Sequence, residues 1–125
     1  MLRQLQIWFR IHFVADILFA LPLFFFPGKF MSLFGWIEID PVMARLVAAA
    51  LFGIGIESLI ASYKADLKAF REMLNLKVIW SFTASAGLVI ALVHGEHARP
   101  LMLWIITGIF ILFHALWLSY RIRLK

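Results

Sequence analysis

The stretch LMLWIITGIFILFHALWLSY, residues 101–120, contains no Asp, Glu, Lys or Arg. A helix needs about 20 consecutive apolar residues to cross the roughly 30 Å of hydrocarbon in a bilayer, and this stretch has that length. Its few polar residues are isolated, whereas a spanning β-strand would be about half as long and would alternate strictly. The stretch therefore predicts a membrane-spanning helix.

Three further apolar segments of similar length precede it, so we expect the chain to cross the membrane four times. Pro27 and Gly28 stop the first segment, because proline cannot continue a helix and glycine permits a reversal. Asp40 and Pro41 suit the N-cap and the first helical position of the second segment. The predicted helices are about 5–26, 41–63, 74–93 and 101–120.

The composition of the chain agrees with a membrane protein. Hydrophobic residues make up 64% of its 125 residues, well above the ~45–50% of a soluble globular domain. A chain of this length forms one domain and cannot hide so much apolar surface from water. We therefore expect a single all-α domain over residues 1–125, a polytopic membrane protein built as an antiparallel bundle of four transmembrane helices.

Some classes of function are excluded or disfavoured by what the sequence lacks. With no cysteine, the chain forms neither a disulfide nor a thiolate or iron–sulfur site. It has no glycine-rich phosphate loop, nucleophile elbow or haem-attachment motif, so no cofactor is expected and an enzyme is not favoured. The net charge of +5 lies at the ends of the apolar segments, where basic residues meet lipid headgroups. Nucleic acid is therefore not an expected partner.

The basic residues are divided unevenly between the two sides that four crossings define. Only Lys29, Arg45 and Arg99 fall on one side. Because basic residues are retained in the cytoplasm, the sequence predicts that both termini and the middle loop are cytoplasmic. The basic residues on the predicted cytoplasmic side are Arg3, Arg10, Lys64, Lys68, Arg71, Lys77, Arg121, Arg123 and Lys125.

Polar residues inside the predicted helices lie at similar depths. Ionisable side chains in hydrocarbon are costly and usually face the interior of a bundle. At a rise of about 1.5 Å per residue, depth can be counted from the cytoplasmic helix ends. Such counting predicts an intramembrane polar layer, filled with water or open to the cytoplasm, formed by His12, Asp16, Glu57, Ser81, Ser85 and His114.

The second predicted helix carries a stripe of small residues. Arg45, Ala49, Gly53, Glu57 and Ala61 recur every four residues, a pattern that allows membrane helices to pack closely. We expect this face to pack against another helix and to bring Glu57 to the polar layer.

The polar layer has three interpretations. Polar residues in membranes often only join helices, through hydrogen bonds that average under ~1 kcal/mol each. A second interpretation is a binding cavity for a small amphiphile, a lipid or a proton. A third is a site for zinc, iron or manganese, although the chain has no Glu-x-x-His motif. Its ligands would be His12, Asp16, Glu57 and His114.

Short motifs and the layout of the chain carry a resemblance. DPVMAR, residues 40–45, enters the second helix, which then carries Gly53, Gly55 and Glu57. In these motifs, in its basic middle loop and in its four apolar segments, the chain resembles the small DoxX-like proteins of bacterial inner membranes. It lacks a cysteine or cofactor signature that would select a redox branch. The resemblance implies a four-helix bundle in a bacterial inner membrane, and no catalytic residue follows from it.

Three functions fit these patterns. The first is non-enzymatic: the protein, surrounded by the lipid bilayer, binds a hydrophobic small molecule or a partner membrane protein through the polar layer. The second is a transporter or channel subunit for protons or small solutes, motivated by the carboxylates of Asp16 and Glu57. It would act as a homo-oligomer, because four helices make a thin wall for a pore. The third is a metal-dependent membrane enzyme.

Overall fold

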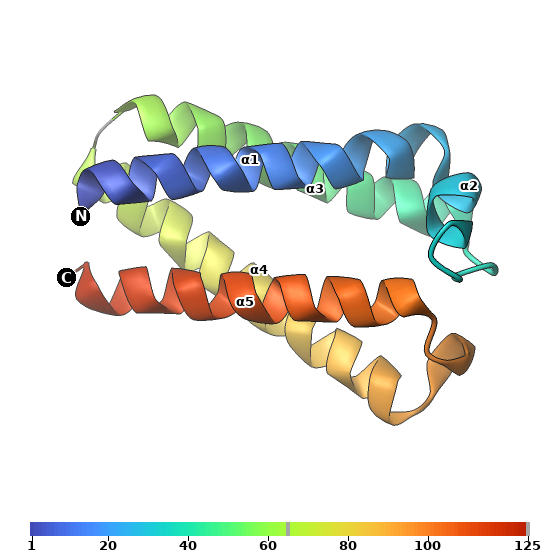
Figure 1. Cartoon of the computed structure of the whole chain (residues 1–125). Coiled ribbons are helices and arrows are strands. Elements are labelled where there is room, and N and C mark those ends of the chain that lie inside the picture. The colour runs from blue at the N-terminus through green and yellow to red at the C-terminus, as the bar shows by residue number, and fades with distance from the viewer. Residues whose placement is uncertain (65, 125) are drawn as a thin grey trace. The chain divides into compact units, whose positions relative to one another are not determined.

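The structure is a computed structural model that describes residues 1–64 and 66–124, so Lys125 lies outside the described residues. The described residues form helices and no strand (Figure 1). Four helices are long and apolar enough to cross a membrane, and the chain is therefore an all-α, multi-pass membrane protein, as predicted. The elements are α1 (Leu2–Phe25), α2 (Pro27–Ser32), α3 (Pro41–Lys64), α4 (Leu67–Val93), the 3₁₀ helix η1 (Glu96–Ala98) and α5 (Leu101–Arg123).

The helix ends follow the proline and N-cap signals in the sequence. α1 ends at Phe25, and Pro27 opens the short helix α2. The Asp40 carboxylate accepts a hydrogen bond of 2.9 Å from the backbone N–H of Val42, which confirms Asp40 as the cap of α3. Gly95 follows α4 with a φ of +66°, a left-handed conformation that glycine adopts without strain.

Helix α4 begins earlier than the apolar pattern indicates, at Leu67 rather than near Leu74. Asp66 Oδ1 accepts a hydrogen bond of 3.0 Å from the backbone N–H of Lys68, so this carboxylate caps the helix. The first turns of α4 carry charged residues. An apolar pattern marks where a helix enters lipid rather than where its backbone hydrogen bonding starts, and this explains the difference.

The helices group into two compact units, and the single domain over residues 1–125 stays a prediction. The α1–α3 unit contains residues 1–33 and 37–70. The α4–α5 unit contains residues 34–36 and the chain from Arg71 onward. The short segment belongs to the α4–α5 unit because Met102 N–H donates a 2.9 Å hydrogen bond to the carbonyl of Phe34. Each unit is thus a hairpin of two long helices that are neighbours along the chain.

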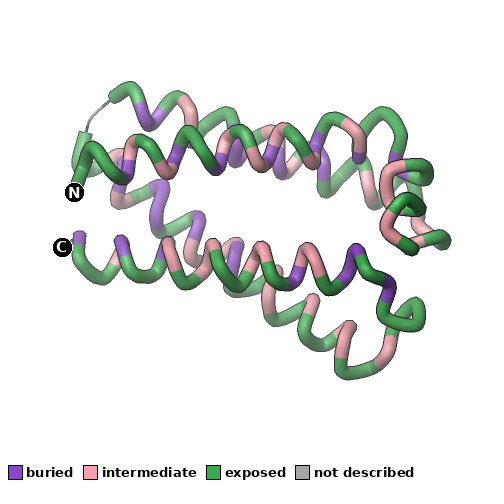
Figure 2. The backbone as a smooth tube through the Cα atoms, viewed as in Figure 1, coloured by how far each residue is buried: buried purple, intermediate pink, exposed green. Residues whose placement is uncertain are grey.

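In the α1–α3 unit, the two long helices lie side by side and antiparallel (Figure 1). Gln6, near the start of α1, donates a 2.9 Å hydrogen bond to the Ser62 carbonyl near the end of α3. At the opposite end, Arg45 Nε near the start of α3 donates a 3.1 Å hydrogen bond to the carbonyl of Phe24 near the end of α1. The buried positions repeat at helical spacing, so each helix buries one side (Figure 2). They are Leu5, Phe9, His12, Asp16, Ala20 and Leu23 on α1, and Ala48, Leu51, Ile54, Gly55, Ser58, Ala61 and Ser62 on α3.

Most of the small-residue stripe predicted on α3 does not pack against α1. Of its five residues Ala61 is buried, whereas Arg45, Ala49, Gly53 and Glu57 are exposed, and a Cβ built on Gly53 would meet nothing within 4 Å. The α1-facing stripe instead contains Gly55 and Ser58, which the helical period of 3.6 residues places on a different side. Small residues occur on both faces of α3, so their spacing alone could not identify the packed face.

In the α4–α5 unit, side chains of the first half of α4 contact side chains of the second half of α5, and the contacting positions run in opposite directions along the two helices. Asn75 Oδ1 accepts a hydrogen bond from Arg121 Nε, and the rings of Trp80 and Phe110 lie 5.9 Å apart. Trp117 is fully buried. These contacts join α4 to α5 in the half of the unit that contains most of its buried polar side chains.

Candidate functional site

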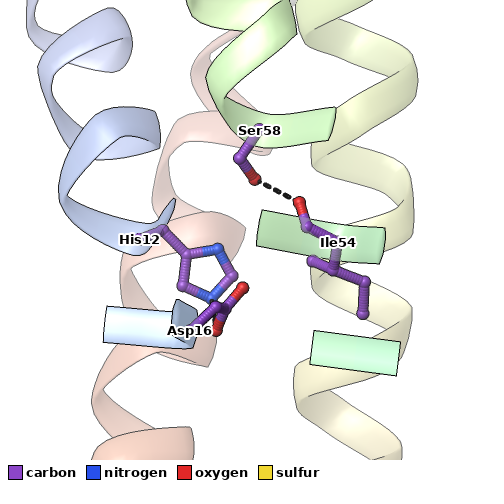
Figure 3. A network of polar contacts seen from close by, with 4 residues as sticks. All are labelled: His12, Asp16, Ile54 and Ser58. Carbon is purple, nitrogen blue, oxygen red and sulfur yellow. Dashed lines mark hydrogen bonds and ion pairs between the residues drawn. The ribbon is translucent and has the colours of Figure 1, made fainter. Parts of the chain in front are cut away.

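The first candidate site is the pair formed by His12 and Asp16 on α1 (Figure 3). His12 Nε2 lies 3.3 Å from Asp16 Oδ1, and both side chains are buried. The two residues are one helical turn apart, as the sequence predicted. The imidazole ring and the carboxylate extend toward α3. Pairing is what makes the burial of such groups tolerable, because an isolated buried charge is very costly.

Ser58 lies on the part of α3 that faces this pair, and the sequence analysis did not single it out (Figure 3). Its hydroxyl donates a 2.8 Å hydrogen bond to the carbonyl of Ile54. Its neighbour on the same face, Gly55, brings the α3 backbone against Asp16. A serine at helical spacing from Gly55 and from Ser62 is the signal that could have identified it.

Glu57 does not join the His12–Asp16 pair, which corrects the expectation that it faces the interior. Its side chain is exposed, and within residues 1–64 and 66–124 it makes no hydrogen bond or ion pair. The rotation of α3 is set by the packing of Gly55 and Ser58 against α1. That rotation turns Glu57 outward.

The second pair of predicted residues lies in the α4–α5 unit. Ser81 Oγ and His114 Nδ1 are 2.9 Å apart, and the His114 ring lies 5.7 Å from the ring of Phe82. Ser85 is half-buried, and its hydroxyl has no hydrogen-bond partner among the described residues. Among its described residues, the unit therefore contains the hydrogen-bonded pair Ser81–His114. One turn away on α4, the Ser85 hydroxyl makes no hydrogen bond with a described residue.

Replacing Ser81 by alanine is expected to lower the free energy of unfolding by about 0.6 kcal/mol, the average worth of a hydrogen bond between membrane helices. The imidazole of His114 loses its Nδ1 partner, so its nitrogen chemical shifts should also change. Ser85→Ala is the matched control. It should change neither the free energy of unfolding nor the nitrogen chemical shifts of His114. Equal destabilisation by the two variants, measured by unfolding in detergent micelles, would argue against the Ser81–His114 bond.

Lys77 is a buried ionisable residue that was not among the predicted site residues, because it was counted with the basic residues on the cytoplasmic side. Its side chain is 0% exposed, and Nζ lies 4.7 Å from the centre of the Trp117 ring, the geometry of a cation–π contact. Lys77, Ser81 and Ser85 recur every four residues on α4. That spacing was the available signal, since it places the lysine on the polar face of the helix.

The structure thus brings four of the predicted residues together in two pairs, His12 with Asp16 and Ser81 with His114, each inside its own unit. A single polar layer across all four long helices stays a prediction. Of the four proposed metal ligands, the structure pairs only His12 with Asp16. Throughout the described part of the chain, no group of three or more His, Cys, Asp or Glu side chains is close enough to hold a metal ion. The two pairs can accept, donate or relay a proton or a hydrogen bond.

Comparison of the chain with known protein families, with curated proteins and with solved structures finds no match.

Proposed function

We propose that this protein is a non-enzymatic membrane subunit that binds a partner membrane protein through the exposed side of α3. The observation that carries the proposal is the exposed carboxyl of Glu57 on an apolar helix long enough to span a bilayer. We call this side of the helix the α3 outer face. It consists of Ala49, Gly53, Ile56, Glu57 and Ile60, all of them exposed.

The depth of Glu57 makes its exposure costly. At about 1.5 Å per residue, Glu57 lies roughly 10 Å along the helix from Lys64 at its end. The whole of α3 is about 36 Å long, only slightly longer than the ~30 Å hydrocarbon core. Glu57 therefore falls within the hydrocarbon, about halfway between the interface and the centre, where a charged side chain costs less than the roughly 2.5–3.5 kcal/mol that it costs at the helix centre. A partner that supplies a hydrogen bond or a positive charge removes this cost.

The remainder of the α3 outer face suits a second helix. Gly53 has nothing within 4 Å of its Cβ position, and Ala49 is small, so a neighbouring backbone can approach closely. The partner helix should carry a lysine, arginine or other hydrogen-bond donor at the depth of Glu57. Parallel pairing with a second copy would bring two Glu57 carboxyls together, and like charges oppose association. We therefore favour a different membrane protein as the partner.

The orientation in the proposal follows the distribution of basic residues. Both termini and the loop between α3 and α4 lie in the cytoplasm, because most Lys and Arg residues fall on that side. Glu57 then belongs to the cytoplasmic half of the membrane. A bacterial inner membrane is the proposed location, supported by the resemblance of the chain to DoxX-like proteins.

Replacing Glu57 by glutamine is expected to weaken partner binding while the protein still inserts. The amide preserves the size of the side chain but removes its charge. With a photocrosslinking amino acid at Gly53, intact membranes should yield an adduct of one defined mass. Glu57→Gln should lower its yield about tenfold, the effect of losing a charge-assisted hydrogen bond.

Two controls sharpen this experiment. Glu72→Gln removes an exposed acid from the first turns of α4 and should leave the adduct unchanged. A crosslinker at Leu112, which is 72% exposed on α5, should not give the same adduct. An adduct that is insensitive to Glu57→Gln would refute the proposal. An adduct of twice the mass of the chain would replace the different partner by a second copy.

The geometry gives less support to the other two functions. Asp16 is buried against Gly55 of α3, whereas Glu57 lies on the outer face of the same helix. The carboxylates of Asp16 and Glu57 were the reason to consider a transporter. They lie at different sides of α3 and so do not face each other along one pathway. A metal-dependent enzyme would need ligands in addition to the paired His12 and Asp16.

A further inference from the structure

A shallow groove of about 430 Å³ runs along α1, on residues that the proposed function does not use. Among the described residues that line it, only Arg10 is charged. The remaining lining is apolar and exposed or half-buried, so the groove is open along its length. Its apolar lining residues are Ile7, Ile11, Val14, Ala15 and Leu18.

The guanidinium of Arg10 is held in place at the groove by α3. Nε donates a 3.2 Å hydrogen bond to Ser62 Oγ, and the guanidinium carbon lies 4.5 Å from the centre of the Tyr63 ring. Ser62 is itself fixed, because its carbonyl accepts the 2.9 Å hydrogen bond from Gln6. A cation that is already oriented loses little side-chain entropy when it binds a ligand.

The two terminal nitrogens of Arg10 are available for such a ligand. Among the described residues, only Nε of this side chain makes a hydrogen bond to protein. The free Nη1 and Nη2 form the planar edge that matches two oxygens of a phosphate group. The site therefore has the chemistry of a phosphate receptor with an apolar extension.

Position and charge indicate that the phosphate belongs to an anionic lipid. Arg10 is about 7 Å inside the predicted apolar start at Leu5, within reach of the headgroups for a long basic side chain. The groove continues about 12 Å toward the membrane centre, from Arg10 to Leu18. Arg3 is exposed at helical spacing from Arg10, and no acidic residue precedes Asp16. The cytoplasmic half of α1 thus carries two arginines and no carboxylate before Asp16, and this excess of positive charge favours a headgroup of net negative charge over a zwitterionic one.

We propose that α1 binds one anionic phospholipid, with its phosphate on the Arg10 guanidinium and one acyl chain along Ile11, Val14 and Leu18. This inference does not rest on the proposed function, because Glu57 is on α3 and does not line the groove. The lipid would be a fixed part of the folded protein rather than one of the exchanging bilayer lipids.

The test is native mass spectrometry of the purified full chain, titrated with phosphatidylglycerol or with phosphatidylcholine. The wild-type chain should retain one phosphatidylglycerol in preference to phosphatidylcholine. Arg10→Gln should weaken this retention about tenfold, the effect of losing a charge-assisted contact. Val14→Trp, at a position that is 51% exposed, should fill the groove and weaken retention without disturbing the α1–α3 packing.

Arg123→Gln is the matched control, because the Arg123 guanidinium lies 4.6 Å from the Tyr120 ring in a similar stacking geometry. It should retain the lipid as the wild-type chain does. Equal losses for Arg10→Gln and Arg123→Gln would overturn the site, as would equal retention of the two lipids. Unchanged retention in Val14→Trp, or displacement of the lipid by inorganic phosphate alone, would overturn the acyl-chain part of the proposal.

Discussion

Replacing Gly55 by alanine is expected to destabilise the α1–α3 unit by about 1–3 kcal/mol, the usual cost of overpacking a close contact. The added Cβ would lie 2.9 Å from Asp16 Cβ and 3.3 Å from Asp16 Oδ2. Asp16 Cβ is bonded directly to the α1 backbone, so it cannot rotate away, and the two helices must separate. This separation would also disturb the His12–Asp16 pair, which is buried at the same contact.

Gly53→Ala is the matched control for this prediction. It makes the same change on the same helix, at a position where a Cβ would meet nothing within 4 Å. Alanine is favoured over glycine in a helix by about 0.8–1.0 kcal/mol, so Gly53→Ala should leave stability unchanged or raise it. The measurement is loss of helicity by circular dichroism as a denaturing detergent is added. Equal shifts in both variants would show that α1 and α3 do not approach closely at Gly55.

Replacing Trp117 by alanine is expected to cost roughly 2–3 kcal/mol, mainly through the cavity that it leaves. Trp117 is 1% exposed, and its ring stacks on Phe113 with centroids 5.6 Å apart. The ring also provides the π face that lies beneath Lys77 Nζ. The variant therefore removes packing and, at the same time, part of the stabilisation of a fully buried ammonium group.

Trp104→Ala is the matched control, because it removes the same type of side chain from an exposed position. Trp104 is on the same helix and is 54% exposed, so Trp104→Ala should change the free energy of unfolding by less than about 0.5 kcal/mol. Unfolding followed by tryptophan fluorescence in micelles, with circular dichroism as a second probe, compares the two variants. A cost at Trp104 as large as that at Trp117 would contradict the buried packing of the α4–α5 unit.

Interactions close in sequence made the long helices predictable. The number of crossings follows from the length of each apolar segment, as in residues 101–120, because a bilayer has a fixed thickness. The ends of α1 and α3 follow from Pro27, Asp40 and Pro41, whose effects on backbone geometry and hydrogen bonding act over a few residues. The pairs His12–Asp16 and Ser81–His114 were also among the expected site residues, since their depth could be counted along each helix.

The sequence by itself determined that this chain is helical, that four helices can cross a membrane, and where each begins and ends to within a few turns. Only the tertiary structure decided which side of each helix is buried. In a soluble protein the buried side is marked by apolar residues, but lipid allows apolar residues on every side of a helix. Hence Ile54 is buried while Ile56 and Ile60 are exposed. For the same reason, only packing against α1 could show that Ser58 faces inward and Glu57 outward.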